Sequence, residues 1–188
     1  MKLSLAMIVR DEADMAPGFL EAAHGLWDEL VVVDTGSKDD TVAIFERAGA
    51  KIVRFAWVGD FAAARNVSLD HATGDFVLVL DADERVDEAF VAECRKLVRD
   101  PDVGALLVRI SNQLPYGHRR DSWVLRGWRN DPSVRFVHPI HEDASDSVAR
   151  LMAKHALTLA RVEPPVEHLG YVRTRAAARD KKVRDTTL

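Results

Sequence analysis

The chain has 188 residues, of which 47% are apolar and 30% are charged, as in an ordinary folded domain and unlike a disordered chain. Its formal net charge of −4 argues against nucleic-acid binding, because proteins that bind nucleic acids are usually basic. A single cysteine, Cys94, excludes an internal disulfide and suits a reducing compartment.

The first 110 residues alternate apolar runs with amphipathic segments. The expected strands are short and β-branched, as in a buried parallel sheet, and lie at 3–9, 30–34, 51–55, 75–81 and 103–110. Between them, apolar periodicity, caps and terminating glycines predict helices at 15–26, from 38–41 to Gly49, at 60–72 and at 87–99. This order predicts an α/β fold of three layers, in which a mostly parallel sheet carries helices on both faces.

The regular alternation ends after Ser111. The elements expected beyond it are a polar loop or flap at 112–121, short aromatic-rich segments at 123–128 and 134–137, a helix at 145–157, a break at Pro164-Pro165 and a short basic helix from Val172. Neither an internal repeat nor a linker divides the chain, so we predict a single domain over 1–188. Cys94 is expected to pack inside the helix at 87–99. Trp57, Trp123 and Trp128 offer rings that can stack on a sugar, and core packing is the preferred expectation for them.

Nothing in the sequence predicts insertion into a membrane. No apolar run approaches ~18 residues, the lower limit for a spanning helix, and residues 1–9 are too short for a signal peptide. We therefore expect a cytoplasmic protein with at most peripheral membrane contact. The oligomeric state is left open.

Three expected strands deliver acidic residues at their ends: Arg10-Asp11-Glu12, Asp34-Thr35-Gly36-Ser37 and Asp81-Ala82-Asp83-Glu84. In a doubly wound sheet, ligands bind outside the carboxyl ends of the strands. These residues are therefore expected to gather in one acidic cleft, where Gly36 and Ala82 leave room for a ligand.

The Asp81-Ala82-Asp83 turn predicts a divalent-metal site. Two carboxylates separated by one small residue can converge on one hard cation, and Mg²⁺ or Mn²⁺ is commonly completed by phosphate oxygens and water. Such a cation would neutralise a diphosphate leaving group. The alternative is a solvated acidic turn ahead of the helix at Asp87, and the apolar strand before the turn favours the metal.

Several motifs occur in an order that resembles the family 2 glycosyltransferases with the GT-A fold, especially the bacterial branch related to lipopolysaccharide-core and peptide S-glycosyltransferases. The matching pieces are Met7–Glu12, Val32–Thr41, Trp57–Asn66, Gly74-Asp75-Phe76 running into Leu80–Glu84, Arg135-Phe136, Ile140-His141-Glu142 and His168-Leu169-Gly170-Tyr171. The resemblance implies a nucleotide-sugar-binding half at 1–110, an acceptor and catalytic half at 111–172 and a basic C-terminal helix at 173–188.

The resemblance also implies roles for individual residues. Asp34 would accept from the base of the nucleotide, Arg65 would lie near the donor phosphates, and Glu142 would be the catalytic base, with His141 orienting it or contacting the diphosphate. Asp81 would contact the ribose or the metal, Asp83 would bind the metal, and His168 could complete its shell. The full set expected at the donor is Val9, Arg10, Glu12, Asp34, Gly36, Arg65, Asp81 and Ala82.

UDP is the nucleotide expected from the family, with GDP and dTDP as alternatives, and transfer is expected to invert the anomeric carbon. The sugar stays open, as does the acceptor, which could be a glycan, a lipid-linked glycan or a protein. The chain is expected to be either a compact member of this family or a piece of a longer protein.

Three rival functions fit the sequence less well. A HAD-type phosphatase would want Thr or Val two residues after the second Asp, where this chain has Arg85. A nucleotidyltransferase would want a glycine-rich basic loop after the first strand, which residues 7–15 lack. A non-catalytic nucleotide-sugar-binding module has no need of Asp34, Asp81, Asp83 and Glu142 together.

Overall fold

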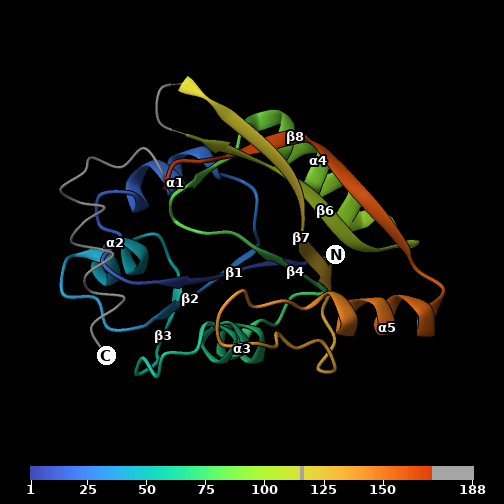
Figure 1. Ribbon diagram of the computed structural model, residues 1–188, viewed down its shortest axis with the longest axis horizontal. Coiled ribbons are helices and arrows are strands. Elements are labelled where there is room, and N and C mark those ends of the chain that lie inside the picture. Colours follow the sequence, from blue (N-terminus) through green and yellow to red (C-terminus); the bar gives the residue numbers. More distant parts are fainter. Residues whose placement is uncertain (115–116, 171–188) are drawn as a thin grey trace.

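The computed structural model describes residues 1–114 and 117–170, and within these ranges the chain forms five helices and one eight-stranded sheet (Figure 1). The strand order is β3-β2-β1-β4-β7-β6-β8-β5. The α/β class expected from the sequence is confirmed.

The first half of the sheet is parallel. It contains β1 (Leu3–Val9), β2 (Glu29–Asp34), β3 (Lys51–Arg54) and β4 (Phe76–Val79), with β1 between β2 and β4. Pairing runs from Ser4 opposite Glu29 to Val9 opposite Asp34, so β1 and β2 end at the same edge of the sheet. The strand-end residues of this half therefore meet at one edge.

The second half is mixed, which corrects the expectation of a simple fifth parallel strand. β7 (Arg119–Arg129) lies antiparallel between β4 and β6 (Val103–Gln113), and β8 (Thr158–His168) runs parallel to β6. The two-residue strand β5 (Glu84–Arg85) pairs antiparallel with the end of β8. β7 follows β6 in a hairpin and then pairs with β4. That pairing joins distant parts of the chain, so the local periodicity of the sequence does not predict it.

Two expectations for this half are wrong. Half of the segment 112–121, expected to be a loop, continues the β6–β7 ladder, because Asn112 pairs with Arg120 and Gln113 with Arg119. The prolines at 164 and 165 do not break the chain either, since β8 runs through them. The register against β6 shifts between Val108 and Ile110, and this irregularity accommodates two residues that cannot donate a ladder hydrogen bond.

The helices form two layers. α1 (Ala16–Ala22), α2 (Thr41–Arg47) and α4 (Glu88–Arg99) contribute to one apolar core, and α3 (Phe61–His71) and α5 (Ser145–His155) contribute to another on the opposite face. Side-chain caps begin two of them as expected: Asp60 accepts from the Ala63 amide at 2.9 Å and Asp87 from the Phe90 amide at 2.8 Å.

The burial of Cys94 and of the tryptophans shows which of them pack in the core. Cys94 is fully buried on α4, and burial raises the pKa of its thiol to about 12, so the packed role expected for it is confirmed. Trp128 is also buried, whereas Trp123 is 37% exposed and Trp57 lines a cavity. Core packing is therefore confirmed for Trp128 and corrected for the other two, whose positions lie beyond the helices that cover the sheet.

Within the described ranges, no helix combines the length and the apolar character needed to cross a membrane. The basic helix expected from Val172 lies outside the described residues.

Asp28 ties the start of β1 to α4. Its carboxylate accepts from the Leu3 amide at 2.8 Å and from both Nη atoms of Arg95, at 2.6 and 3.0 Å. The Arg95 hydrogen bonds lower the pKa of Asp28 to about 2. This contact holds the central strand against the helical layer from the first residues of the chain.

We predict that Asp28→Asn lowers the free energy of unfolding by about 1 kcal/mol at pH 7, the upper range for a partly exposed ion pair. Because the folded pKa lies below the ordinary 3.8, this contribution is present above about pH 4 and is lost as the pH falls toward 2. Urea titrations at pH 7 and pH 3 should show the difference shrinking, while Glu46→Gln on the exposed face of α2 shows no such trend. An equal difference at both pH values would contradict the assignment.

Candidate functional site

A cavity of about 370 Å³ lies at the carboxyl ends of β1, β2 and β4. Residues that follow these strands form one wall: Arg10 and Glu12 after β1, Thr35 after β2, and the turn 81–83 after β4. The parallel register of these strands places the three chain segments at one edge. This is the edge at which open α/β sheets bind ligands.

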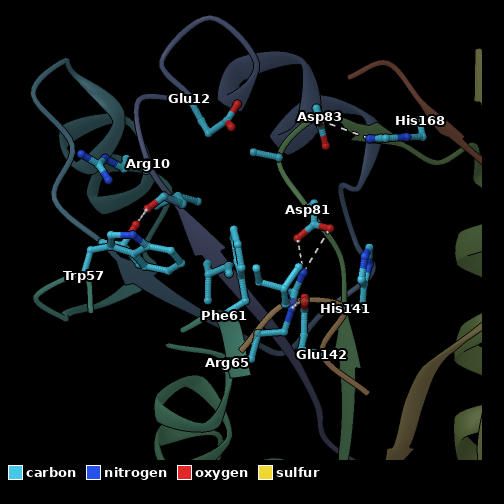
Figure 2. Close-up of a pocket in the computed structure, with 15 residues that line it drawn as sticks. Arg10, Glu12, Trp57, Phe61, Arg65, Asp81, Asp83, His141, Glu142 and His168 are labelled. Atoms are coloured by element: carbon cyan, nitrogen blue, oxygen red, sulfur yellow. Dashed lines mark hydrogen bonds and ion pairs between the residues drawn. The ribbon is translucent and has the colours of Figure 1, made fainter. Parts of the chain in front are cut away.

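The rest of the wall comes from distant parts of the chain (Figure 2). Trp57 lies ahead of α3, and Phe61 and Arg65 lie on its first turns. The loop residues Ile140, His141 and Glu142 and the last residue of β8, His168, complete the lining. Trp57 and Phe61 meet edge to face with ring centroids 4.7 Å apart, which gives this wall a rigid aromatic part.

Asp81 is held by two arginines from different elements. Arg65 on α3 donates from Nη2 to both carboxylate oxygens, at 3.0 and 3.3 Å, and Arg126 on β7 approaches Oδ2 at 3.4 Å. Burial acts to raise the pKa of Asp81, but the two guanidiniums outweigh it and hold that pKa well below its usual range. Asp81 is therefore a fixed anion at the cavity wall.

Glu84 closes the turn that begins at Asp81. Its Oε2 accepts from the Asp81 amide at 2.9 Å, and its Oε1 accepts from Nη2 of Arg126 at 2.8 Å. The side chain is only 1% exposed, and burial raises its pKa to about 7. Glu84 thus shapes the turn from behind, and the Asp81-Ala82-Asp83 segment is presented to the cavity.

The loop that carries Glu142 is fastened to α3. Asn66 both donates to the Phe136 carbonyl at 3.0 Å and accepts from its amide at 2.9 Å, and the Phe61 amide donates to the Pro139 carbonyl at 2.9 Å. Arg65 then donates from Nε to Glu142 Oε1 at 2.7 Å. These contacts give Glu142, which is 17% exposed, a fixed place beside Asp81.

Asp83 and His168 form a second polar group at the cavity. Asp83 Oδ2 lies 3.4 Å from His168 Nε2, and the hydrogen bond with Asp83 raises the pKa of the imidazole. His168 Nδ1 is 2.8 Å from the Asn112 side-chain oxygen, which orients the ring. A Cβ on Gly170 would come within 2.7 Å of Asp83 Oδ2 and 2.8 Å of His168 Nε2, so only glycine fits over this pair.

The structure brings together on this cavity all residues predicted for the site except Asp34 and Gly36. Asp34 is 3% exposed and accepts from the Ser37 amide at 3.0 Å, which closes the turn after β2. Gly36 has a φ of 108°, a conformation that favours glycine, so its role there is to let the turn form. The neighbouring Thr35 lines the cavity in their place.

The predicted metal ligands separate into two groups. Asp81 faces the arginines, while Asp83 and His168 face each other. Among the residues that the structure describes, no three His, Cys, Asp or Glu side chains converge as a ready-made metal site. Oxygen and imidazole donors of the Asp83–His168 pair suit Mn²⁺, and the metal site stays a prediction.

Sequence reasoning missed Arg126 and the role of Glu84. Arg126 stands within a strand among aromatic residues and has no local motif, so no sequence signal would have found it. Phe61 lies inside the Trp57–Asn66 motif and could have been named from it.

Three cavity-lining side chains have buried N–H groups without an acceptor in the described part of the chain: Arg10 Nε, Trp57 Nε1 and Arg65 Nη1. Buried donors are nearly always paired in native proteins, so unpaired ones need an explanation. An oxygen-rich ligand in the cavity would supply acceptors beside them.

Comparison with known proteins identifies the family of this chain. Residues 4–150 match the model of the family described as Glycosyl transferase family 2. A TPR repeat-containing protein of Synechococcus elongatus is 40% identical over 184 residues, which cover 95% of this chain and 44% of that protein. The chain spans less than half the length of the curated relatives it matches.

Solved structures share the fold. Mannosyltransferase PcManGT from Pyrobaculum calidifontis, in complex with GDP-Man and Mn²⁺, has a TM-score of 0.67 at 20% identity over 98% of this chain and 61% of its own. S. aureus TarS 1-349, in complex with UDP-GlcNAc, has a TM-score of 0.55 at 24% identity over 64% of this chain and 37% of its own. At these identities the likeness establishes a GT-A-type α/β fold.

We predict that Arg126→Met lowers the free energy of unfolding by roughly 3 kcal/mol at pH 8.5, because it leaves Glu84 buried without its cation. The loss should be smaller at pH 6, where the unpaired carboxyl takes up a proton in the folded state. Urea titrations at both pH values measure it.

Two controls isolate the pair. Adding Glu84→Gln to Arg126→Met should recover at least half of the loss, since the unpaired buried charge at position 84 is then gone. Arg120→Met, on the exposed part of the same strand, should change the free energy of unfolding by less than about 0.5 kcal/mol. An equal loss from both arginine variants would refute a special role for Arg126.

Proposed function

The chain belongs to glycosyl transferase family 2, and from that premise we propose that its cavity binds a nucleoside-diphosphate sugar and transfers the sugar to an acceptor with inversion at the anomeric carbon. One observation carries the proposal: unpaired buried N–H donors and the acidic turn 81–83 share one cavity at the carboxyl ends of the parallel strands. Donors for phosphate or base oxygens and carboxylates for a cation are what such a substrate requires.

UDP is the nucleotide we propose, with GDP as the alternative. The likeness to TarS, solved with UDP-GlcNAc, favours the first, and the likeness to PcManGT, solved with GDP-Man and Mn²⁺, favours the second. Arg10 and Trp57 both line the cavity, and their unpaired N–H groups suit oxygens of the nucleotide. Arg65 contacts Asp81 through Nη2, and its unpaired Nη1 suits a phosphate oxygen.

Asp83 and His168 are the residues we propose to hold a divalent metal. Their donor atoms lie 3.4 Å apart, and Gly170 leaves both accessible where any side chain would obstruct them. The metal, when bound, would neutralise the charge that develops on the diphosphate leaving group. Asp81, fixed by its arginines, would act on the ribose or on metal-bound water rather than as a direct ligand.

Glu142 is the proposed catalytic base. In the transfer step, an acceptor oxygen bonds to the anomeric carbon, the bond from that carbon to the phosphate oxygen breaks, and its electron pair leaves with the nucleoside diphosphate. The acceptor proton passes to Glu142. Glu142 lines the cavity and is anchored through Oε1 by Arg65, so its position is set before the substrate arrives.

Calorimetric titration of the protein with UDP and GDP, with and without Mn²⁺, tests the donor site. We expect binding of one nucleotide to strengthen at least tenfold with Mn²⁺, and Asp83→Asn to remove most of that gain because it takes away the charged ligand. Affinity without metal should change little in the variant.

The matched control is Glu46→Gln, which removes one exposed carboxylate on α2 and should leave both titrations unchanged. If neither nucleotide binds the protein under any condition, the glycosyltransferase proposal is wrong for this chain.

The catalytic role of Glu142 has its own test. Glu142→Gln keeps an oxygen for the Arg65 hydrogen bond but cannot accept a proton, so we expect UDP affinity to stay within about threefold. Release of UDP from UDP-GlcNAc and UDP-glucose, to water or an added acceptor, should fall by roughly 10²–10⁴. Binding without turnover in the unmodified protein would instead indicate a non-catalytic nucleotide-sugar-binding module.

A further inference from the structure

One face of the second half of the sheet is largely uncovered. Val108 on β6, Val124 on β7 and Val162 on β8 point into the core shared with α4. Because side chains alternate along a strand, their neighbours Arg109, Trp123 and Arg161 point to the opposite face.

α5 covers only part of that opposite face. It packs against the start of β6, where Gly104 meets Leu157 and Met152. The β6–β7 hairpin extends away from α5 (Figure 1). Trp123 is 37% exposed and Leu159 is 48% exposed. We call the surface formed by Arg109, Trp123, Leu159 and Arg161 the Trp123 face.

The Trp123 face carries two arginines with no acidic partner in the part of the chain that the structure describes. The Arg161 guanidinium lies over the Trp123 ring at 5.1 Å from its centroid. Arg109 pairs with Trp123 in the β6–β7 register, and its Nε is buried without a hydrogen-bond acceptor. The indole thus holds one guanidinium in place while the sheet holds the other beside it.

The Trp123 face lies next to the cavity along β7. Arg126, which contacts Asp81, is the extra residue of a β-bulge between Leu125 and Gly127 and lies three residues from Trp123, a distance of roughly 10 Å in an extended chain. A molecule longer than one sugar unit can therefore reach from the cavity to this face.

Resting on the function proposed above, we propose that the Trp123 face binds the negatively charged part of an extended saccharide acceptor. Guanidinium forks match carboxylate and phosphate oxygens, and an exposed indole packs against the apolar side of a sugar ring. β7 pairs with β4 only from Gly127 to Arg129, so the strand edge beside Trp123 is open, but the guanidiniums and the indole lie on the face of the sheet rather than along that edge. The chemistry favours a saccharide that carries oxyanions over an acidic peptide.

Binding of matched oligomers tests the proposal. Calorimetry at 50 mM salt would compare hexagalacturonate with hexaglutamate, whose chains carry the same number of side carboxylates, and with uncharged maltohexaose. We expect hexagalacturonate to bind best, and Arg109→Gln/Arg161→Gln to weaken it by roughly tenfold or more. Arg161→Gln alone, at an exposed site that should not disturb folding, and Trp123→Leu should each weaken it measurably.

The control double variant Arg47→Gln/Arg99→Gln removes the same charge from exposed positions on α2 and α4 and should change the affinity less than about twofold. UDP binding, measured in parallel, should be unaffected by all of these variants. If UDP fails to bind but the binding of hexagalacturonate still requires Arg109 and Arg161, the proposal for the Trp123 face is supported and the proposed donor site is wrong.

Two results would overturn the proposal. If hexaglutamate binds as tightly as hexagalacturonate with the same losses, the face serves acidic peptides. If hexagalacturonate does not bind, or binds equally well to the Arg109→Gln/Arg161→Gln variant and the control, the face is not an acceptor surface.

Discussion

The ion-paired chain through Asp81 is the constraint on which the site depends. Glu84, Arg126, Asp81, Arg65 and Glu142 alternate in charge, and each contacts the next. They come from the turn after β4, from β7, from α3 and from the loop after Pro139. Arg65 and Glu84 are largely removed from water, and buried charges are tolerated only when each has its partner. The alternation therefore fixes the turn, the helix and the loop relative to one another.

The same arrangement separates two tasks at the cavity. The arginines bind Asp81 from one side, whereas the neighbouring carboxylate, Asp83, contacts His168. The proposed base, Glu142, lies at the other end of the chain of charges. Donor binding, metal binding and proton transfer would then use different parts of one rigid wall, and the Trp123 face would extend that wall toward the acceptor.

Much of the first half could be predicted because its signals are local. The run 3–9 is largely apolar, Asp60 and Asp87 cap their helices, and the strand ends deliver acidic residues in sequence. The second half was predicted less well. Pairing of β7 with β4 joins residues about fifty apart, and the passage of β8 through its two prolines depends on an irregular register with β6. Neither leaves a periodic trace in the chain.

The sequence by itself determined the α/β class, the family and the acidic turn at 81–83, because strand propensity, caps and motif order are properties of neighbouring residues. Only the tertiary structure decided that Asp81 faces two arginines while Asp83 faces His168. It also decided that Asp34 closes a turn outside the cavity lining. Those outcomes depend on which side chains the fold places next to each carboxylate. Coulomb attraction in a buried site is set by three-dimensional distance rather than by position along the chain.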